Sequence, residues 1–258
     1  ENWAHLQDLL FDGSWNEQLG RFRSPCAFRG LSDASYPLET TLIRLGGPFD
    51  RLEQHLLRNF IKYAHRDVVA QDSYWHWLSV AQHHGLPTRL LDWTHSPLVA
   101  MHFATANTDK YDVDGAVWCV DYEQTHRLLP KAIRQQLQRE GANTFTTELL
   151  GRAVTSLEEL DQMSDDPFLL LFEPPSMDGR IVNQFALFSV MSNARLGLDV
   201  WIREHAELCL KVVIPARLKW EIRDKLDQSN VTERVLFPGL DGLSHWLHRH
   251  YSPKTPPA

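Results

Sequence analysis

Apolar side chains recur at helical intervals through the first 110 residues of the chain. Four stretches have large apolar residues three or four positions apart, and each predicts a helix: 3–19, 51–64, 74–84 and 97–105. The fourth begins with Pro97, which suits the first turn of a helix, and Thr94 or Ser96 can cap it. This part of the chain is therefore expected to be mainly helical.

Short runs rich in β-branched and aromatic residues are typical of strands, and most of them lie later in the chain. We expect strands at 25–31, 88–93, 115–120, 167–172, 181–190 and 208–214. A helical stretch, 218–226, follows the last run, and a short helix closes the chain. The pattern predicts an α+β fold in which a helical N-terminal part is followed by a mostly antiparallel or mixed sheet.

The composition fits an ordinary globular protein. The chain has 258 residues, of which 43% are hydrophobic and 23% are charged. A chain of this length can bury one large core, and we expect a single domain over residues 1–251. Residues 252–258 are polar and rich in proline, so we expect them to form a disordered tail or the start of a linker.

The charge balance and the cysteines restrict the function and the compartment. There are 33 acidic and 26 basic residues, a net charge of −7, which disfavours a nucleic-acid binder with a wholly basic surface. No apolar run approaches the roughly 20 residues needed to span a bilayer, so we expect a soluble, cytoplasmic chain with no membrane partner. The chain starts without Met, and a removed targeting segment stays open. Cys26, Cys119 and Cys209 are far apart in the sequence and favour a reducing compartment over a disulfide scaffold.

Several familiar enzyme motifs are absent from the sequence. It has no glycine-rich dinucleotide fingerprint, no phosphate-binding loop ending in Gly-Lys-Ser/Thr, no Gly-x-Ser-x-Gly elbow and no His-Glu-x-x-His pair. We expect no metal site. The weaker alternative is a metal-assisted hydrolase or nuclease that uses Asp241, His245 and His248, which a helix would place on one face. A solvated helix face is the competing interpretation.

The segment 82–104 carries an unusual concentration of hydrogen-bonding side chains. Its central polar and aromatic residues are Thr88, Arg89, Asp92, Trp93 and Thr94. An unpaired polar group costs roughly 1–3 kcal/mol when it is buried, so these residues either form a network or face a cleft. If these residues have a purely structural role, Arg89 and Asp92 pair within the fold.

This segment and four others resemble the FRG domain family, which is named for its Phe-Arg-Gly tripeptide. The segments that carry the resemblance are Phe28-Arg29-Gly30, 37–44, 82–94, 180–188 and 236–243. The chain departs from the family pattern at two points. A glycine often stands near Gln184, where this chain continues with Phe185, and His102 occupies a position where an aromatic residue is expected. The resemblance implies a protein of bacterial or phage-associated origin.

The order of the expected elements also resembles that of ADP-ribosyltransferases, in which an early Arg or His and a middle Ser/Thr segment embrace NAD. This resemblance implies a chain that binds NAD and transfers ADP-ribose to a macromolecular target, and the FRG resemblance implies a bacterial effector, a toxin or an antiphage defence protein. NAD would be its substrate. Arg29 would hold a phosphate or a ribose, and a late acid would stabilise the positive charge that develops on the ribose. Glu173 and Gln184 are the candidates for that position, and Glu148 is a further one.

Eight residues are candidates for binding NAD: Arg29, Gly30, His84, Thr88, Arg89, Asp92, Thr94 and Arg180. Arg180 would clamp a phosphate, because its guanidinium is planar and bidentate, but it is equally able to pair with Asp178 or Glu173. His83 and His84 are candidate general bases or hydrogen-bond donors.

A non-catalytic module is the alternative from a different class. In this interpretation the chain is a nucleotide- or protein-binding sensor within a larger defence protein, and the arginines shape a pocket without turnover. The acceptor stays open between protein, RNA, DNA and a small molecule. A neutralising or sensor partner protein is expected if the chain is an effector.

Overall fold

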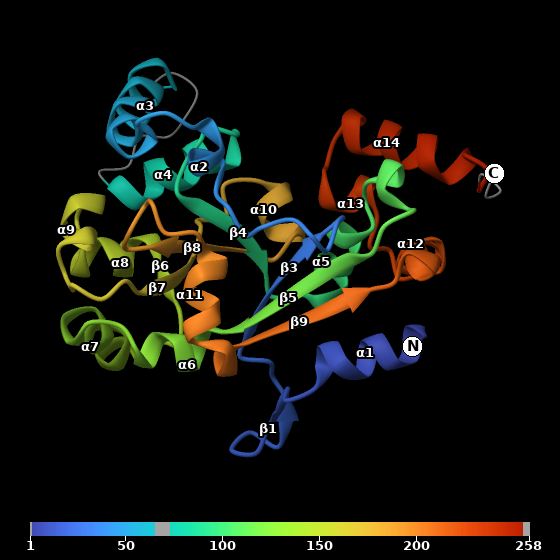
Figure 1. The fold of residues 1–258 in the computed structure, drawn as a ribbon, viewed down its shortest axis with the longest axis horizontal. Helices are drawn as coiled ribbons and strands as arrows, with labels where there is room; N and C mark the ends of the chain where they lie inside the picture. Colours follow the sequence, from blue (N-terminus) through green and yellow to red (C-terminus); the bar gives the residue numbers. More distant parts are fainter. Residues whose placement is uncertain (1, 65–72, 255–258) are drawn as a thin grey trace.

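The computed structural model describes residues 2–64 and 73–254 (Figure 1). About 50% of the chain is helical and 17% is in strands, which confirms the α+β class. Residues 255–258 of the expected tail lie outside the described residues. Within the described residues, no helix is both long and apolar enough to cross a membrane.

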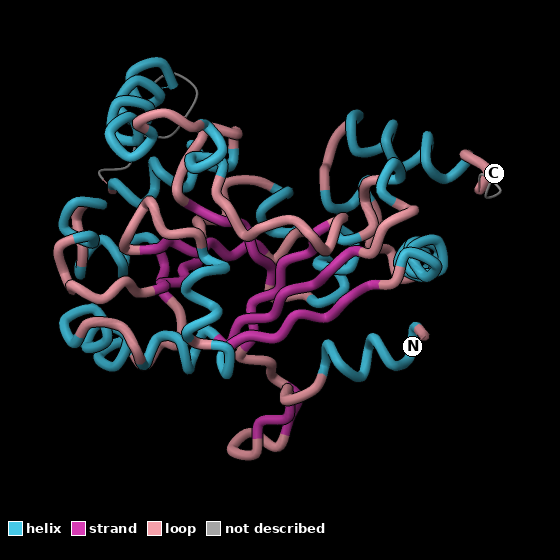
Figure 2. Tube along the Cα trace, in the orientation of Figure 1, coloured by secondary structure: helices cyan, strands magenta, loops and turns pink. Residues whose placement is uncertain are grey.

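The centre of the described structure is a seven-stranded mixed sheet in the order β6-β7-β8-β4-β3-β5-β9 (Figure 2). Only β6 and β7 are parallel, and the other neighbouring strands in the sheet are antiparallel. The strands are β3 Cys26–Leu31, β4 Leu90–Thr94, β5 Gly115–Asp121, β6 Phe145–Thr146, β7 Leu169–Glu173, β8 Ala186–Met191 and β9 Cys209–Ile214.

Helices surround the sheet and fill most of the connections between its strands. The α-helices are α1 Trp3–Phe11, α2 Thr41–Leu45, α3 Phe49–Ala64, α4 Tyr74–His83, α5 Pro97–Ala104, α6 Tyr122–Arg127, α7 Lys131–Glu140, α8 Thr147–Ala153, α9 Leu157–Asp161, α10 Gly179–Asn183, α11 Leu198–Glu204, α12 Lys219–Gln228, α13 Glu233–Leu236 and α14 Leu240–Tyr251. Three short 3-10 turns are η1 Thr108–Lys110, η2 Ala206–Leu208 and η3 Ala216–Leu218.

The sheet divides into two halves between β3 and β4. β3 pairs with β5 along its whole length, whereas β3 and β4 pair only at Phe28 and Thr94. One apolar cluster packs β7 and β8 against α3, α4 and α7–α9. A second packs β3, β5 and β9 against α1, α5 and α12. A third cluster under α11 is formed by alternate residues of strands from both halves, and it therefore joins the halves on the other face.

Two of the sequence-based assignments are wrong. The helix expected over 3–19 ends at Phe11, and the chain then forms a small hairpin of β1, Trp15–Asn16, and β2, Arg21–Phe22. Asp12 leaves the helical conformation with a ψ of 148°, and Gly13 then turns the chain toward the hairpin with a positive φ of 66°. The strand expected over 181–190 begins only at Ala186, because Asp178 caps the short helix α10 by accepting from the N–H of Ile181.

The largest part of the fold that the sequence pattern does not predict is the segment 122–161, which holds the four helices α6–α9. The other expected elements are present at shifted bounds. In particular, α5 begins at Pro97, and the Oγ of Ser96 accepts from the N–H of Val99 at its N-terminus, as expected.

Candidate functional site

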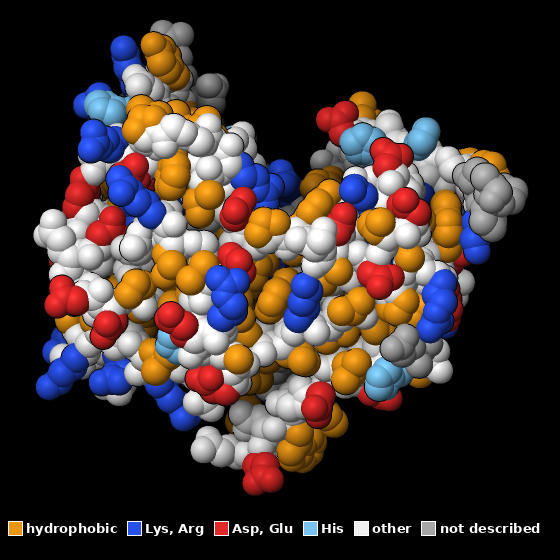
Figure 3. Space-filling model, in the orientation of Figure 1, with side chains coloured by type: hydrophobic (Ala, Val, Ile, Leu, Met, Phe, Trp, Pro, Cys, Tyr) orange, Lys and Arg blue, Asp and Glu red, His pale blue; other side chains and the backbone are white. Residues whose placement is uncertain are grey.

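A cleft of about 690 Å³ opens where β3 and β4 separate. The surface is hollowed between the helices α2–α4 and the helices α13 and α14, with basic side chains close to the hollow (Figure 3). The volume is within the range of small-molecule sites. The cleft is lined by Phe28, Arg29, Gly30, Thr41, Gln82, His83, His84, Gly85, Leu86, Asp92, Trp93, Thr94, Phe103, Arg180, Ile181, Gln184, Ala186 and Phe188.

The cleft brings together most of the site residues predicted from the sequence. Those that line it are Arg29, Gly30, His84, Asp92, Thr94, Arg180 and Gln184. Sequence reasoning missed Thr41, Gln82, Phe103 and Phe188 as lining residues. The position of Gln82 inside the polar segment was the available signal, whereas no local pattern marks Phe103 or Phe188.

Arg29 bridges the two halves of the sheet at the cleft. Its Nη1 donates to the backbone carbonyl of Asp92 at 2.5 Å and lies 3.9 Å from the carboxylate of the same residue. Burial lowers the pKa of Arg29 and Asp92 opposes this shift, so the guanidinium stays charged at neutral pH. Its buried Nε has no hydrogen-bond partner among the described residues. Its Nη2 also donates no hydrogen bond within the described residues, so Arg29 keeps donor capacity for a ligand.

Gly30 allows α5 to pack directly on β3. A Cβ at this position would overlap the backbone oxygen of Ala100 and lie 2.6 Å from the backbone nitrogen of Ala104. Only glycine fits so close a helix–strand contact. The third residue of the Phe-Arg-Gly tripeptide thus fixes the distance between the strand that carries Arg29 and the helix beside it.

A chain of two hydrogen-bonded side chains orients the exposed carboxylate of Asp92. Both of its oxygens accept from the Nε2 of Gln82 at 3.1 Å. The Oε1 of Gln82 accepts from the hydroxyl of Thr88 at 2.5 Å. Thr88 is buried and does not line the cleft, so its part in the site is to position Gln82.

Thr94 and Gln184 join β4 to the turn before β8. The hydroxyl of Thr94 donates to the backbone carbonyl of Gln184 at 2.6 Å, and the side-chain Nε2 of Gln184 donates to the carbonyl of Leu236 at 2.9 Å. The next residue, Phe185, has a positive φ of 48° and is 59% exposed. A glycine adopts this backbone without strain, so the departure from the family pattern falls at a strained position beside the cleft.

The C-terminal segment forms part of the wall that holds Arg180. The guanidinium of Arg180 lies over the ring of Phe237, 5.2 Å from its centroid. Among the residues that the structure describes, no carboxylate forms an ion pair with Arg180, so the pairing with Asp178 or Glu173 that the sequence left open is not found. Its charge therefore faces the cleft without a fixed counter-ion.

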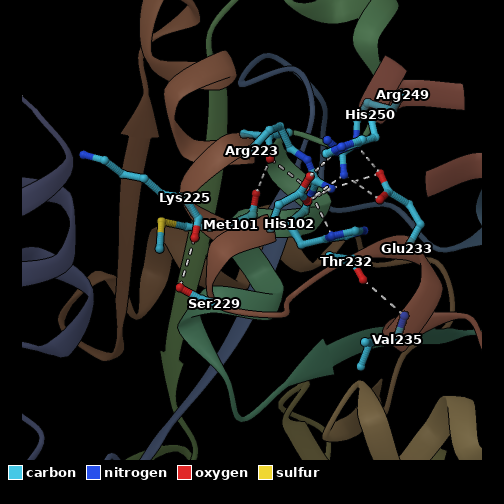
Figure 4. A network of polar contacts seen from close by, with 12 residues as sticks. Met101, His102, Arg223, Lys225, Ser229, Thr232, Glu233, Val235, Arg249 and His250 are labelled. Carbon is cyan, nitrogen blue, oxygen red and sulfur yellow. Dashed lines mark hydrogen bonds and ion pairs between the residues drawn. The ribbon is translucent and has the colours of Figure 1, made fainter. Parts of the chain in front are cut away.

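A buried ion network anchors this C-terminal wall (Figure 4). Glu233 accepts from the guanidinium of Arg223 at 2.9 Å and from that of Arg249 at 2.8 Å. Arg223 also donates to the Nδ1 of His102 at 2.7 Å. Burial, together with the charge of Arg223, lowers the pKa of His102 to about 3, so its ring is neutral. The network ties α5, α12, α13 and α14 together.

Arg89 does not lie on the cleft. Its Nε donates to both carboxylate oxygens of Glu53, at 3.0 and 2.8 Å, and its Nη atoms donate to Asp161. Although burial opposes it, these two carboxylates raise the pKa of Arg89. Arg89 is a structural ion-pair residue whose partners are Glu53 and Asp161 rather than Asp92.

Only one of the three candidates for the late catalytic position lines the cleft. Gln184 is the lining residue. Glu173, at the end of β7, lies 3.3 Å from His95 and accepts from the Thr144 hydroxyl at 3.1 Å, and its interaction with His95 holds its pKa low. Glu148 is exposed in the first turn of α8.

The metal alternative gains no support from the described residues. Asp241, His245 and His248 lie on α14 and are all exposed. Across 2–64 and 73–254, no group of three or more His, Cys, Asp or Glu side chains is arranged to hold a metal ion.

The protein is therefore of the α+β class, and its cleft is polar, contains two arginines and lies where β3 and β4 separate. Residues 24–113 match the family model of the FRG domain. The matched segment contains Arg29, Gly30 and Asp92 but ends before Arg180 and Gln184. No curated protein and no solved structure matches the chain.

Proposed function

We propose that the cleft binds NAD and that the protein transfers ADP-ribose from NAD to an acceptor. The observation that supports this most is the convergence of Arg29, Thr94, Arg180 and Gln184 on one cleft. These residues come from β3, β4, α10 and the turn after it, and 155 positions separate Arg29 from Gln184 in the sequence.

The two arginines suit the diphosphate of a dinucleotide. A guanidinium offers several N–H donors in one plane and binds phosphate oxygens in pairs. Arg29 approaches from β3, and Arg180 approaches from α10. Aromatic rings often line the sites of planar ligands, and four such residues line this cleft: Phe28, Trp93, Phe103 and Phe188.

The polar groups of the cleft can act on the ribose. Cleavage of the bond between nicotinamide and ribose develops positive charge on the sugar, which a nearby carboxylate stabilises. Among the described residues that line the cleft, Asp92 alone is a carboxylate, so we assign this role to it. The Oε1 of Gln184 accepts no hydrogen bond within the described residues, and we assign it to a ribose hydroxyl.

A non-catalytic NAD-binding module is the second candidate, and two observations favour it. Both oxygens of Asp92 already accept from Gln82, and Glu173 lies outside the cleft lining. A site of this kind binds the ligand without cleaving it. In either case, a role as a bacterial toxin or antiphage effector, with a macromolecular target and a neutralising partner, is a proposal from family resemblance.

Nicotinamide release from NAD separates the two candidates. We expect wild-type protein to bind NAD in calorimetry and to release nicotinamide, and Arg29→Ala to lose both while it stays folded and unfolds cooperatively. The matched control is Arg203→Ala, because Arg203 is 68% exposed on α11 and pairs only with Asp199 among the described residues. Binding without release would favour the module, and no binding at millimolar NAD would overturn both candidates.

A further inference from the structure

A histidine–aspartate pair borders the cleft, and neither candidate function uses it. His83 is the last residue of α4, lines the cleft and has a side chain that is only 10% exposed. Its Nε2 lies 2.8 Å from the Oδ2 of Asp178. The other oxygen of Asp178 accepts from the N–H of Ile181 at 3.0 Å. The carboxylate is therefore held in place by its own helix cap while it orients the imidazole.

This geometry sets the tautomer of His83. A carboxylate only accepts hydrogen bonds when it is ionised, so Nε2 carries the proton and Nδ1 keeps its lone pair. Although burial raises it, the N–H of Ile181 and His83 lower the pKa of Asp178, which keeps it ionised.

The surroundings of His83 keep it neutral at physiological pH. Burial lowers its pKa, Asp178 partly offsets this shift, and the nearby Arg180 and His84 lower the pKa further. A neutral imidazole with a free nitrogen is the form that can accept a proton.

We propose that His83, oriented by Asp178, is the general base that deprotonates an acceptor hydroxyl during ADP-ribose transfer. The inference rests on the proposed function. The bond between the ribose C1′ and the nicotinamide nitrogen breaks, and its electron pair leaves with neutral nicotinamide. The acceptor oxygen forms the new bond to C1′, and its proton passes to the Nδ1 of His83 and then to water. In this proposal the acceptor is a hydroxyl, which carries a proton that must be removed.

A comparison of two small nucleophiles tests the base directly. Methanol needs a base to remove its proton, whereas azide is an anion that attacks without losing one. With methanol, we expect His83→Ala to lower the rate of nicotinamide release from NAD by about 10²- to 10⁴-fold. With azide, the same variant should release nicotinamide at the wild-type rate, and its Kd for NAD should be unchanged. The matched control, His5→Ala, removes an exposed histidine of α1 and should behave as wild type with both nucleophiles.

Two further variants keep the test independent of folding. His83→Asn preserves a donor toward Asp178, and it should show the same selective loss with methanol at an unchanged Tm. Asp178→Asn removes the carboxylate that favours the charged imidazole. The rise of the methanol-dependent rate with pH should therefore move to lower pH than in wild type.

The possible failures of this inference are distinguishable. If His83→Ala lowers the rate of nicotinamide release equally with methanol and with azide, His83 is not the general base, because a positioning role affects both nucleophiles. A wild-type protein that binds NAD but releases no nicotinamide would also overturn it while leaving the binding module intact. A wild-type protein that binds no NAD would overturn the proposed function and the inference together.

Discussion

The arginines of the C-terminal network and those of the cleft lie within one molecule but have different surroundings. Arg223 and Arg249 are buried, and each donates to Glu233. Arg29 and Arg180 line a hollow, and within the described residues neither guanidinium donates a hydrogen bond to a carboxylate. A guanidinium closed by carboxylates holds helices together, whereas one with unused donors is available to an anionic ligand.

Removal of Glu233 is expected to have the largest effect on stability. Glu233→Ala leaves Arg223 without a carboxylate at hydrogen-bond distance and leaves Arg249 with Asp227 as its remaining partner, which costs about 3–5 kcal/mol of unfolding free energy. Urea unfolding measures the loss. The matched control is Glu140→Ala on the exposed pair with Arg152, which should cost about 1 kcal/mol or less. Equal losses of unfolding free energy in the two variants would contradict a stabilising role of the buried network.

Acid should weaken the network, because Glu233 must stay ionised to pair with its two arginines. Although burial raises it, hydrogen bonds from Arg249 and the charge of Arg223 lower the pKa of Glu233 to about 2. A folded pKa below the unfolded value of about 4.3 contributes stability that is complete near neutrality and is lost as pH falls from about 5 toward 2. This contribution is about 3 kcal/mol, and Glu233→Gln should flatten the pH dependence of urea unfolding. An unchanged slope in this variant would contradict the assignment.

A side chain at position 30 should destabilise the packing of α5 on β3 beside the cleft. Gly30→Ala places a Cβ against the backbone of Ala100 and Ala104, and overpacking of this kind costs about 1–3 kcal/mol. Gly151→Ala is the matched control. Gly151 lies in α8, and a Cβ there would lie 3.8 Å from the Oγ of Ser73, which is an ordinary contact distance. That change should stabilise the helix by about 0.5–1 kcal/mol. Thermal unfolding of both variants checks the opposite signs.

The smallest effect is expected where the C-terminal wall contacts the cleft, at the Phe237 ring beneath Arg180. Phe237→Leu removes the ring beneath Arg180 but keeps an apolar side chain. A cation–π contact contributes about 0.5–1 kcal/mol, so the Kd for NAD should rise about two- to fivefold. Calorimetry measures this change. An unchanged Kd would show that the C-terminal wall does not position Arg180 for the ligand.

The sequence predicted the elements with strong local signals and missed those that depend on distant partners. β3 and α5 were predicted because the apolar run of the strand and the Ser96-Pro97 start of the helix are local signals. The five-residue helix α10 was not, since it has little periodicity and continues directly into the turn before β8.

The candidate site shows the same division. Arg29 and Arg89 have similar sequence signals, but the partners of Arg89 are 36 and 72 positions away along the chain. Only the fold could show that Glu53 and Asp161 close around Arg89. The pair of His83 and Asp178 spans 95 positions and has no local signature.

Titration of the protein with NAD tests the central claim most directly. We predict saturable binding in calorimetry and a rise in Tm that grows with the NAD concentration, because the ligand stabilises the folded state in proportion to ln(1 + [NAD]/Kd). Both signals should disappear in Arg29→Ala and persist in Arg203→Ala. A folded wild-type protein that shows neither signal up to millimolar NAD, or an Arg29→Ala variant that binds NAD as wild type does, would contradict the account.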